Sequence, residues 1–246
     1  MVAIAIISMV GAAIGTLTQA LQVHVRFSEG RNTALQHARV TLSRIQRVVN
    51  QATASEQFPG AVVFADTDSG WRYPETLVVW CPTGTAVDPD GLPRFRELKV
   101  YCPHPTSPQQ LLEITAPSDS RTVPALTNTS TWATELTALK TGNTATRVVL
   151  TEMVRTGSVG TNKIRAAVRF EVERRPSATQ WSSYRAGTTA WTDVNWVQDV
   201  FGAETGLAQT WVRMELQIVP AAVGGTTAET PLVFFGSGAV YYELRK

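Results

Sequence analysis

The feature that most constrains this chain is its first 58 residues, which hold no proline and, before Arg26, no charged residue. Thirteen of residues 1–17 are Ala, Val, Ile, Leu or Met. An apolar helix of roughly 20 residues spans a bilayer core of about 30 Å, and the absence of proline leaves the helix uninterrupted. We predict one helix to about residue 55, roughly 80 Å long. A small domain cannot bury that length, so residues 1–25 need lipid or neighbouring chains.

Residues 26–55 continue the helical period with a different pattern. Apolar residues recur every three or four positions, and arginines fill the places between them. This is one apolar stripe on an otherwise polar helix. Phe58-Pro59-Gly60 then supplies a stop. The stripe predicts that the helix packs against its own head domain through Leu35, Ala38, Leu42, Ile45 and Val49.

Residues 59–246 consist of short runs rich in Val, Ile, Leu and aromatic residues, separated by Gly, Pro, Ser and Thr, which is typical of strands. Several runs alternate apolar and polar residues, as antiparallel strands with one wet face do. We predict an α+β fold with two parts: a helix over 1–58 and a mostly antiparallel β head over 59–246. The segments 117–143 and 177–198 read as surface loops. The predicted strands are 61–65, 76–81, 95–102, 110–115, 146–154, 163–173, 210–219, 232–235 and 239–244.

Composition argues against several classes of function. The formal net charge of +2 gives no reason to expect nucleic acid as a partner. The sequence contains no phosphate-binding glycine loop, nucleophile elbow or HExxH motif, so we predict no enzymatic activity. Two carboxylate pairs, Asp66/Asp68 and Asp88/Asp90, have calcium-like spacing but lack the downstream glutamate of an EF-hand loop. Hairpin turns explain them better than calcium does, and we expect no cofactor.

Three interpretations compete for the apolar N-terminus. A cleaved secretory signal lacks its basic leading region here, and the helical pattern continues far beyond any cleavage point. A simple single-span anchor has all its nearby arginines after the span, which predicts a cytoplasmic head. A pair of disulfide-bonded cysteines would instead place the head in an oxidising compartment, which the cytoplasm is not. A family resemblance gives the third interpretation.

The run Met1-Val2-Ala3-Ile4-Ala5-Ile6-Ile7-Ser8-Met9-Val10-Gly11-Ala12-Ala13-Ile14 resembles the N-terminal helix of type IV pilins and pseudopilins. The segment 35–60 further resembles the large minor pseudopilins of the J type of type II secretion. In this family a basic leader and a Gly-Phe-Thr-Leu-x-Glu stretch precede the apolar run. The resemblance therefore implies that the present sequence starts inside that run, with the processing site upstream of Met1.

The resemblance also implies where the chain works and with what. It predicts a single-pass protein of the bacterial inner membrane with an extracytoplasmic head, which then joins other pilin or pseudopilin subunits in an open helical polymer. The expected function is that of a structural subunit of a pilus-like or secretion filament. A membrane-anchored extracytoplasmic binding or sensor domain is the alternative. The helix would pack in the membrane or filament through Ile4, Ile7, Gly11, Ile14 and Gly15.

Two features of the sequence leave alternatives open. Gly11 and Gly15 form a small-xxx-small face for close helix approach, or they merely permit helix curvature. Cys81 and Cys102 each end a strand-like run and each precede proline. This parallel placement predicts a disulfide between adjacent strand ends, with two unpaired core thiols as the other option. A metal site lacks further ligands.

Overall fold

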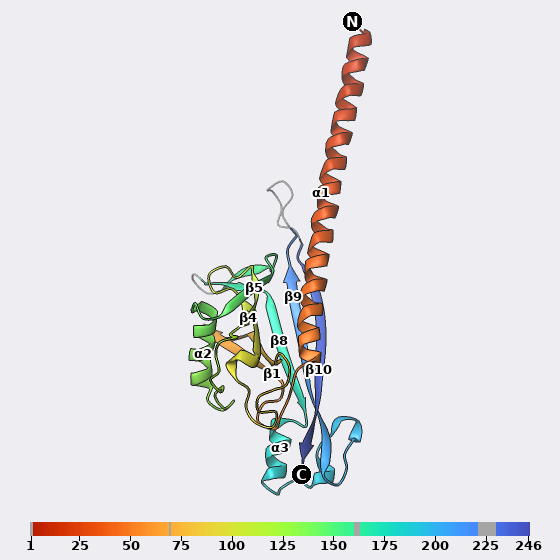
Figure 1. Cartoon of the computed structure of the whole chain (residues 1–246). Coiled ribbons are helices and arrows are strands. Elements are labelled where there is room, and N and C mark those ends of the chain that lie inside the picture. The colour runs from red at the N-terminus through yellow and green to blue at the C-terminus, as the bar shows by residue number, and fades with distance from the viewer. Residues whose placement is uncertain (1, 69, 160–162, 221–229) are drawn as a thin grey trace.

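The structure, a computed structural model, describes the backbone of residues 2–68, 70–159, 163–220 and 230–246, and within these the side chains from Met9 onward. One helix, α1 (Val2–Asn50), begins at the N-terminus and ends inside a β-rich head. Its 49 residues give a length of about 73 Å. The first half projects from the head, and the C-terminus lies at the opposite end of the molecule (Figure 1). The class is α+β, with a long N-terminal helix and antiparallel sheets.

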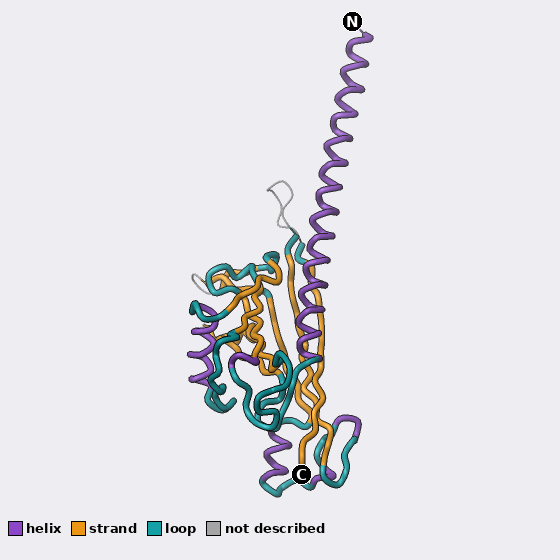
Figure 2. Tube along the Cα trace, viewed as in Figure 1, coloured by secondary structure: helices purple, strands orange, loops and turns teal. Residues whose placement is uncertain are grey.

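Two larger sheets and a hairpin build the head, and all their strand pairings are antiparallel. The strands lie beside the second half of α1 (Figure 2). The first sheet has the order β1-β2-β3-β4-β5, the second β10-β9-β8, and β6 pairs with β7. The strands are β1 (Ala61–Asp68), β2 (Trp71–Trp80), β3 (Leu98–Pro103), β4 (Leu111–Thr115), β5 (Thr146–Thr151), β6 (Thr156–Val159), β7 (Lys163–Ala166), β8 (Val168–Arg175), β9 (Thr205–Ile218) and β10 (Leu232–Arg245).

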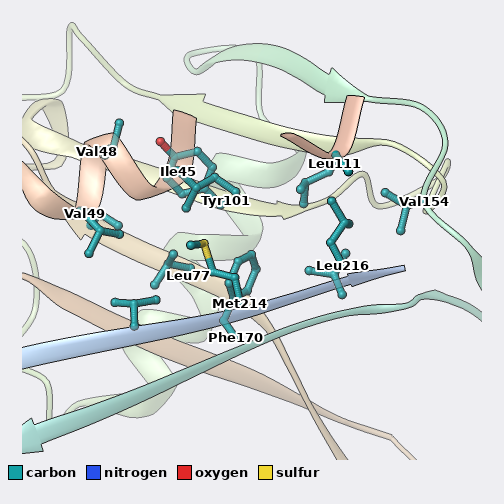
Figure 3. Packing of buried hydrophobic residues seen from close by; sticks show 14 of the residues in the cluster. Ile45, Val48, Val49, Leu77, Tyr101, Leu111, Val154, Phe170, Met214 and Leu216 are labelled. Carbon is teal, nitrogen blue, oxygen red and sulfur yellow. The ribbon is translucent and has the colours of Figure 1, made fainter. Parts of the chain in front are cut away.

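The main core lies where the second half of α1 meets both sheets. Ile45, Val48 and Val49 of the helix pack with side chains from the inner faces of the five-stranded and three-stranded sheets (Figure 3). In β9 the alternation is regular, because Val212, Met214, Leu216 and Ile218 are all buried in this core. Each residue between them lies on the opposite face of the sheet. Helix and sheets therefore share one continuous apolar interior.

A second core covers the other face of the five-stranded sheet. Helix α2 (Thr129–Thr141) lays Trp132, Leu136 and Leu139 against buried residues of β2, β3 and β4. This helix falls in the segment 117–143, which the sequence predicted to be a surface loop, and that prediction was wrong. The three buried residues are spaced four and three apart, as one face of a helix requires. The polar Thr and Ser residues around them hid this pattern.

The segment 177–198 is also more ordered than the loop predicted there. It contains helix α3 (Ala178–Arg185) and the short helical turns η2 (Trp191–Asp193) and η3 (Val197–Asp199). A further turn, η1 (Phe95–Glu97), precedes β3. Trp191 and Trp196 are buried with Ala208 and Leu244 in a small core at the far end of β9 and β10. Aromatic bulk thus closes the end of the three-stranded sheet.

Strand β10 joins two runs that the sequence predicted as separate strands. Its residues Gly236 and Gly238 face α1 closely: a Cβ at Gly238 would lie 3.0 Å from Asn50 Oδ1. A Cβ at Gly236 would lie 3.4 Å from the Leu42 side chain of α1. The glycines that looked like a break in the strand are therefore the positions where the helix approaches the sheet backbone.

Candidate functional site

The first half of α1 presents apolar side chains to solvent along the part of the helix that projects from the head (Figure 1). Met9 is 77% exposed and Leu17 is 62% exposed. Every described side chain of α1 before Gly30 is exposed. Monomeric proteins rarely leave a continuous apolar surface of this kind uncovered. Its other large apolar members are Val10, Ile14, Leu21, Val23, Val25 and Phe27.

The predicted packing residues of this half are placed as follows. Ile14 is exposed, and nothing lies within 4 Å of a Cβ built at Gly11 or Gly15. The side chains of Ile4 and Ile7 lie outside the described residues. The helix passes through Gly11 and Gly15 without a break. Across the described part of the chain, a search for a helix with a span apolar and long enough to cross a bilayer found none.

The predicted head-packing residues lie on the opposite half of the helix. Ala38, Ile45 and Val49 are buried in the main core, and Leu42 packs against it while partly exposed. Leu35 is half-buried. The structure adds Ala34, Thr41 and Val48 to the buried face, which the predicted stripe omitted. The Thr41 hydroxyl lies 3.4 Å from the Leu150 carbonyl of β5.

A buried carboxylate ties α1 to the five-stranded sheet. Arg44 donates from Nε and from one terminal nitrogen to the two oxygens of Glu113 on β4, at 2.8 and 2.9 Å. The Tyr101 hydroxyl of β3 donates to the same carboxylate at 3.1 Å. The Arg44 side chain is 48% exposed, whereas that of Glu113 is 6% exposed. Bidentate pairing of this kind fixes orientation as well as adding energy.

The environment of Glu113 favours its charged form. Burial alone would raise the pKa of this carboxyl, but the hydrogen bonds and charge of Arg44, with the Tyr101 hydroxyl, outweigh burial and hold the pKa below its usual value. Burial and the neighbouring carboxylate raise the pKa of Tyr101 far above its ordinary range, so its hydroxyl stays a donor. Sequence reasoning placed Arg44 among the polar fillers of the helix. Its partner is 69 residues away, so no local pattern could identify the pair.

The end of α1 is held by two further polar contacts. Asn50 Oδ1 accepts a hydrogen bond of 3.0 Å from the backbone N–H of Ala239 on the edge strand β10. Just beyond the helix, Glu56 accepts from Arg185 of α3 at 3.1 and 2.6 Å and from the Trp181 indole at 3.2 Å. Helix, edge strand and distal aromatic core are thereby joined.

The predicted disulfide is contradicted, because Cys81 and Cys102 are both free. Cys81 pairs in register with Glu97, while Cys102 follows Tyr101, the partner of Leu77. The two cysteines are therefore five residues apart along the ladder, about 16 Å, whereas a disulfide needs Cα atoms within about 7 Å. They also point into opposite cores. Burial raises the pKa of Cys102 to about 11 and raises that of Cys81.

The carboxylates with calcium-like spacing have other partners. Asp66 and Asp68 lie on β1 close to the buried Arg165, at 3.6 and 3.7 Å, and Lys163 lies 3.3 Å from Asp68. Arg165 also pairs with Glu75 at 2.7 Å. Basic side chains thus occupy the place a cation would take. Among the described residues no group of three or more His, Cys, Asp or Glu is placed to hold a metal ion, the second pair Asp88/Asp90 included.

With this geometry established, the chain was compared with known proteins. The search of protein-family models, the search of curated proteins and the search of solved structures each found no match.

Proposed function

We propose that this chain is a non-enzymatic structural subunit, a minor pilin or pseudopilin, of a type IV pilus-like or type II secretion filament. The subunit assembles by packing its apolar N-terminal helix against the helices of neighbouring subunits. Before assembly, residues 1–25 rest in inner-membrane lipid with the head on the extracytoplasmic side. One observation carries the proposal: the apolar half of α1 projects uncovered from a head that firmly holds the other half.

The energetic argument starts from the exposed side chains of that half. Burial of apolar surface contributes roughly 25 cal/mol per Å², so a helix with large exposed residues such as Ile14, Leu17 and Leu21 gains from any apolar cover. Lipid supplies such cover before assembly, and neighbouring helices supply it afterwards. Gly11 and Gly15 leave room for a close helix neighbour. Contacts that repeat from one subunit to the next generate an open helical polymer.

A single-span anchored binding or sensor domain is the competing function. It requires lipid alone around the projecting half, with no neighbouring subunit. The two functions therefore differ in what the same side chains touch in the cell. Replacement of one apolar side chain by a carboxylate disturbs both situations, so the assay must count subunits in filaments separately from subunits in the membrane.

The test compares Leu17→Asp with the control Gln36→Asp, which adds the same carboxylate at an exposed position of α1 outside residues 1–25, in the native host. Filaments are sheared from cells or recovered after overproduction, and the chain is quantified in the filament and membrane fractions. We expect wild type and Gln36→Asp in filaments, and Leu17→Asp depleted from them by about tenfold or more. A wild-type chain found only in membranes, as a monomer, would contradict the proposal and favour the anchored domain.

A further inference from the structure

A groove between the packed half of α1 and strand β3 has an unusual charge. It has a volume of about 520 Å³. Four cations and no carboxylate line it, the complete lining being Arg39, Val40, Ser43, Arg44, Arg47, Val48, Gln51 and Lys99. Cavities lined by one sign of charge focus the electrostatic field and attract the opposite charge.

Among the described residues, only one of these four cations has an ion-pair partner. Arg44 forms an ion pair with the buried Glu113. Arg39, Arg47 and Lys99 have no ion pair within 4 Å with any carboxylate of the described residues. Counted over the part of the chain that the structure describes, three of the four cations lining the groove have no ion-pair partner.

The sequence of α1 keeps this groove basic. Between Glu29 and Glu56 there is no acidic residue, whereas four arginines occur in the same stretch. Exposed protein surfaces ordinarily intersperse both signs of charge. On the head some arginines are paired, such as Arg213 with Glu171 and Glu173. Others, such as Arg94 and Arg96, have no ion pair within 4 Å among the described residues. The groove differs from isolated unpaired arginines because Arg39, Arg47 and Lys99 line one hollow that no carboxylate lines, which suits carboxylates supplied by another molecule.

We infer that this groove docks an acidic peptide segment of a neighbouring filament subunit, an inference that rests on the proposed function. Arginine presents a planar fork that matches carboxylates. Val40, which is 66% exposed, offers an apolar contact beside the charges. From Arg39 to Gln51 the helix extends about 18 Å, which suits five or six residues of extended chain. The groove also continues the projecting half of the same helix, so one neighbour can contact both.

A nucleic acid fits the groove less well than a peptide does. A long polyanion is attracted by charge spread over a whole surface, whereas residues 59–246 carry a net charge of −1. The head as a whole therefore offers such a polymer no excess of positive charge. A short segment with two or three carboxylates matches the local charge.

The experiment places a photoactivatable benzoylphenylalanine at Val40 of the full chain in the native host, and the cross-linked peptide is sequenced by mass spectrometry. It is repeated with Arg39→Glu/Arg47→Glu, and with Arg31→Glu as the control outside the groove. We expect a peptide with two or more Asp or Glu from another filament subunit. The double reversal should reduce this adduct about tenfold or more, and the control should leave it unchanged.

Several results would overturn the inference. One is an adduct to nucleic acid, to lipid or to a peptide without acidic residues. Another is an adduct to an acidic peptide whose yield does not change in the Arg39→Glu/Arg47→Glu variant. Circular dichroism of each variant checks the fold, which should survive because both arginines are exposed. The Leu17→Asp assay separates the two claims. If that variant is lost from filaments while the Val40 adduct is independent of charge, the groove inference alone fails. If wild type forms no filaments, both fail.

Discussion

The two halves of α1 contain similar apolar side chains in opposite situations. Ile14 and Leu17 stand in solvent, whereas Ile45 and Val49 are completely enclosed by the two sheets. The projecting half is the more apolar of the two, yet the packed half is the one that is buried. Apolar content therefore did not decide which half the head would cover. The packed half offers small residues such as Ala34 and Ala38 and a single stripe, and strand β10 offers glycines where the helix approaches.

The largest effect should come from matched truncations in the two halves. Ile45→Ala removes a buried side chain and leaves a cavity, so we expect it to reduce the free energy of unfolding by about 2–5 kcal/mol. Ile14→Ala removes the same atoms from an exposed site and should change it by less than about 0.5 kcal/mol. Urea unfolding of the full chain in mild detergent measures both. Equal losses would mean that the two halves are equally packed in the isolated subunit.

The ion pair that anchors the helix gives the next contrast. Arg44→Met leaves Glu113 buried with only Tyr101 as a hydrogen-bond partner among the groups described above. Loss of one partner from a buried ion pair reduces the free energy of unfolding by several kcal/mol. Because Arg44 is half-exposed, we expect a smaller loss of about 2 kcal/mol. Arg47→Met, on the same helix without an ion pair to a described carboxylate, should be nearly neutral.

The pH dependence of this contrast has a definite sign. The folded-state pKa of Glu113 is depressed, so the pair adds stability above the unfolded-state pKa of about 4.3. That stability is lost as pH falls through the lower folded-state pKa. The difference between wild type and Arg44→Met should therefore be full at pH 7 and should shrink at acidic pH. A difference that grows as pH falls would contradict the assignment of Glu113 as a paired carboxylate.

The smallest effect compares glycines. Gly238→Ala places a Cβ 3.0 Å from Asn50 Oδ1 and 3.1 Å from Val49, so we expect a loss of about 1 kcal/mol in unfolding experiments. Gly11→Ala meets no neighbour in the subunit and improves helix propensity by about 1 kcal/mol. In filaments the order of the two variants should reverse, and Gly11→Ala should be incorporated less efficiently than Gly238→Ala. Normal incorporation of Gly11→Ala would favour the helix-curvature explanation of the small residues.

The sequence predicted those features whose pattern lies within one short segment of the chain. The stripe of Ala38, Leu42, Ile45 and Val49 repeats with the helical period, and the structure places these residues on the face toward the core. The same signal was present in Trp132, Leu136 and Leu139, but threonine and serine around them led to a loop prediction. Thirteen residues give few repeats, so composition outweighed period there.

Long-range pairings could not be read in this way. The cysteines have matching neighbours in the sequence, but their relation depends on how β2 and β3 align. Antiparallel register separates them and turns them to opposite faces. Arg44 and Glu113 likewise meet only because the second half of α1 packs against the five-stranded sheet.

The most direct measurement of the central claim is photo-cross-linking from Leu17 in intact cells, with the probe at Gln36 on the exposed side of the packed half for comparison. The account predicts that the adduct from Leu17 joins this chain to the apolar N-terminal helix of another filament subunit. It also predicts that the adduct disappears when assembly is blocked. An adduct from Leu17 to lipid alone, unchanged by assembly, would contradict it.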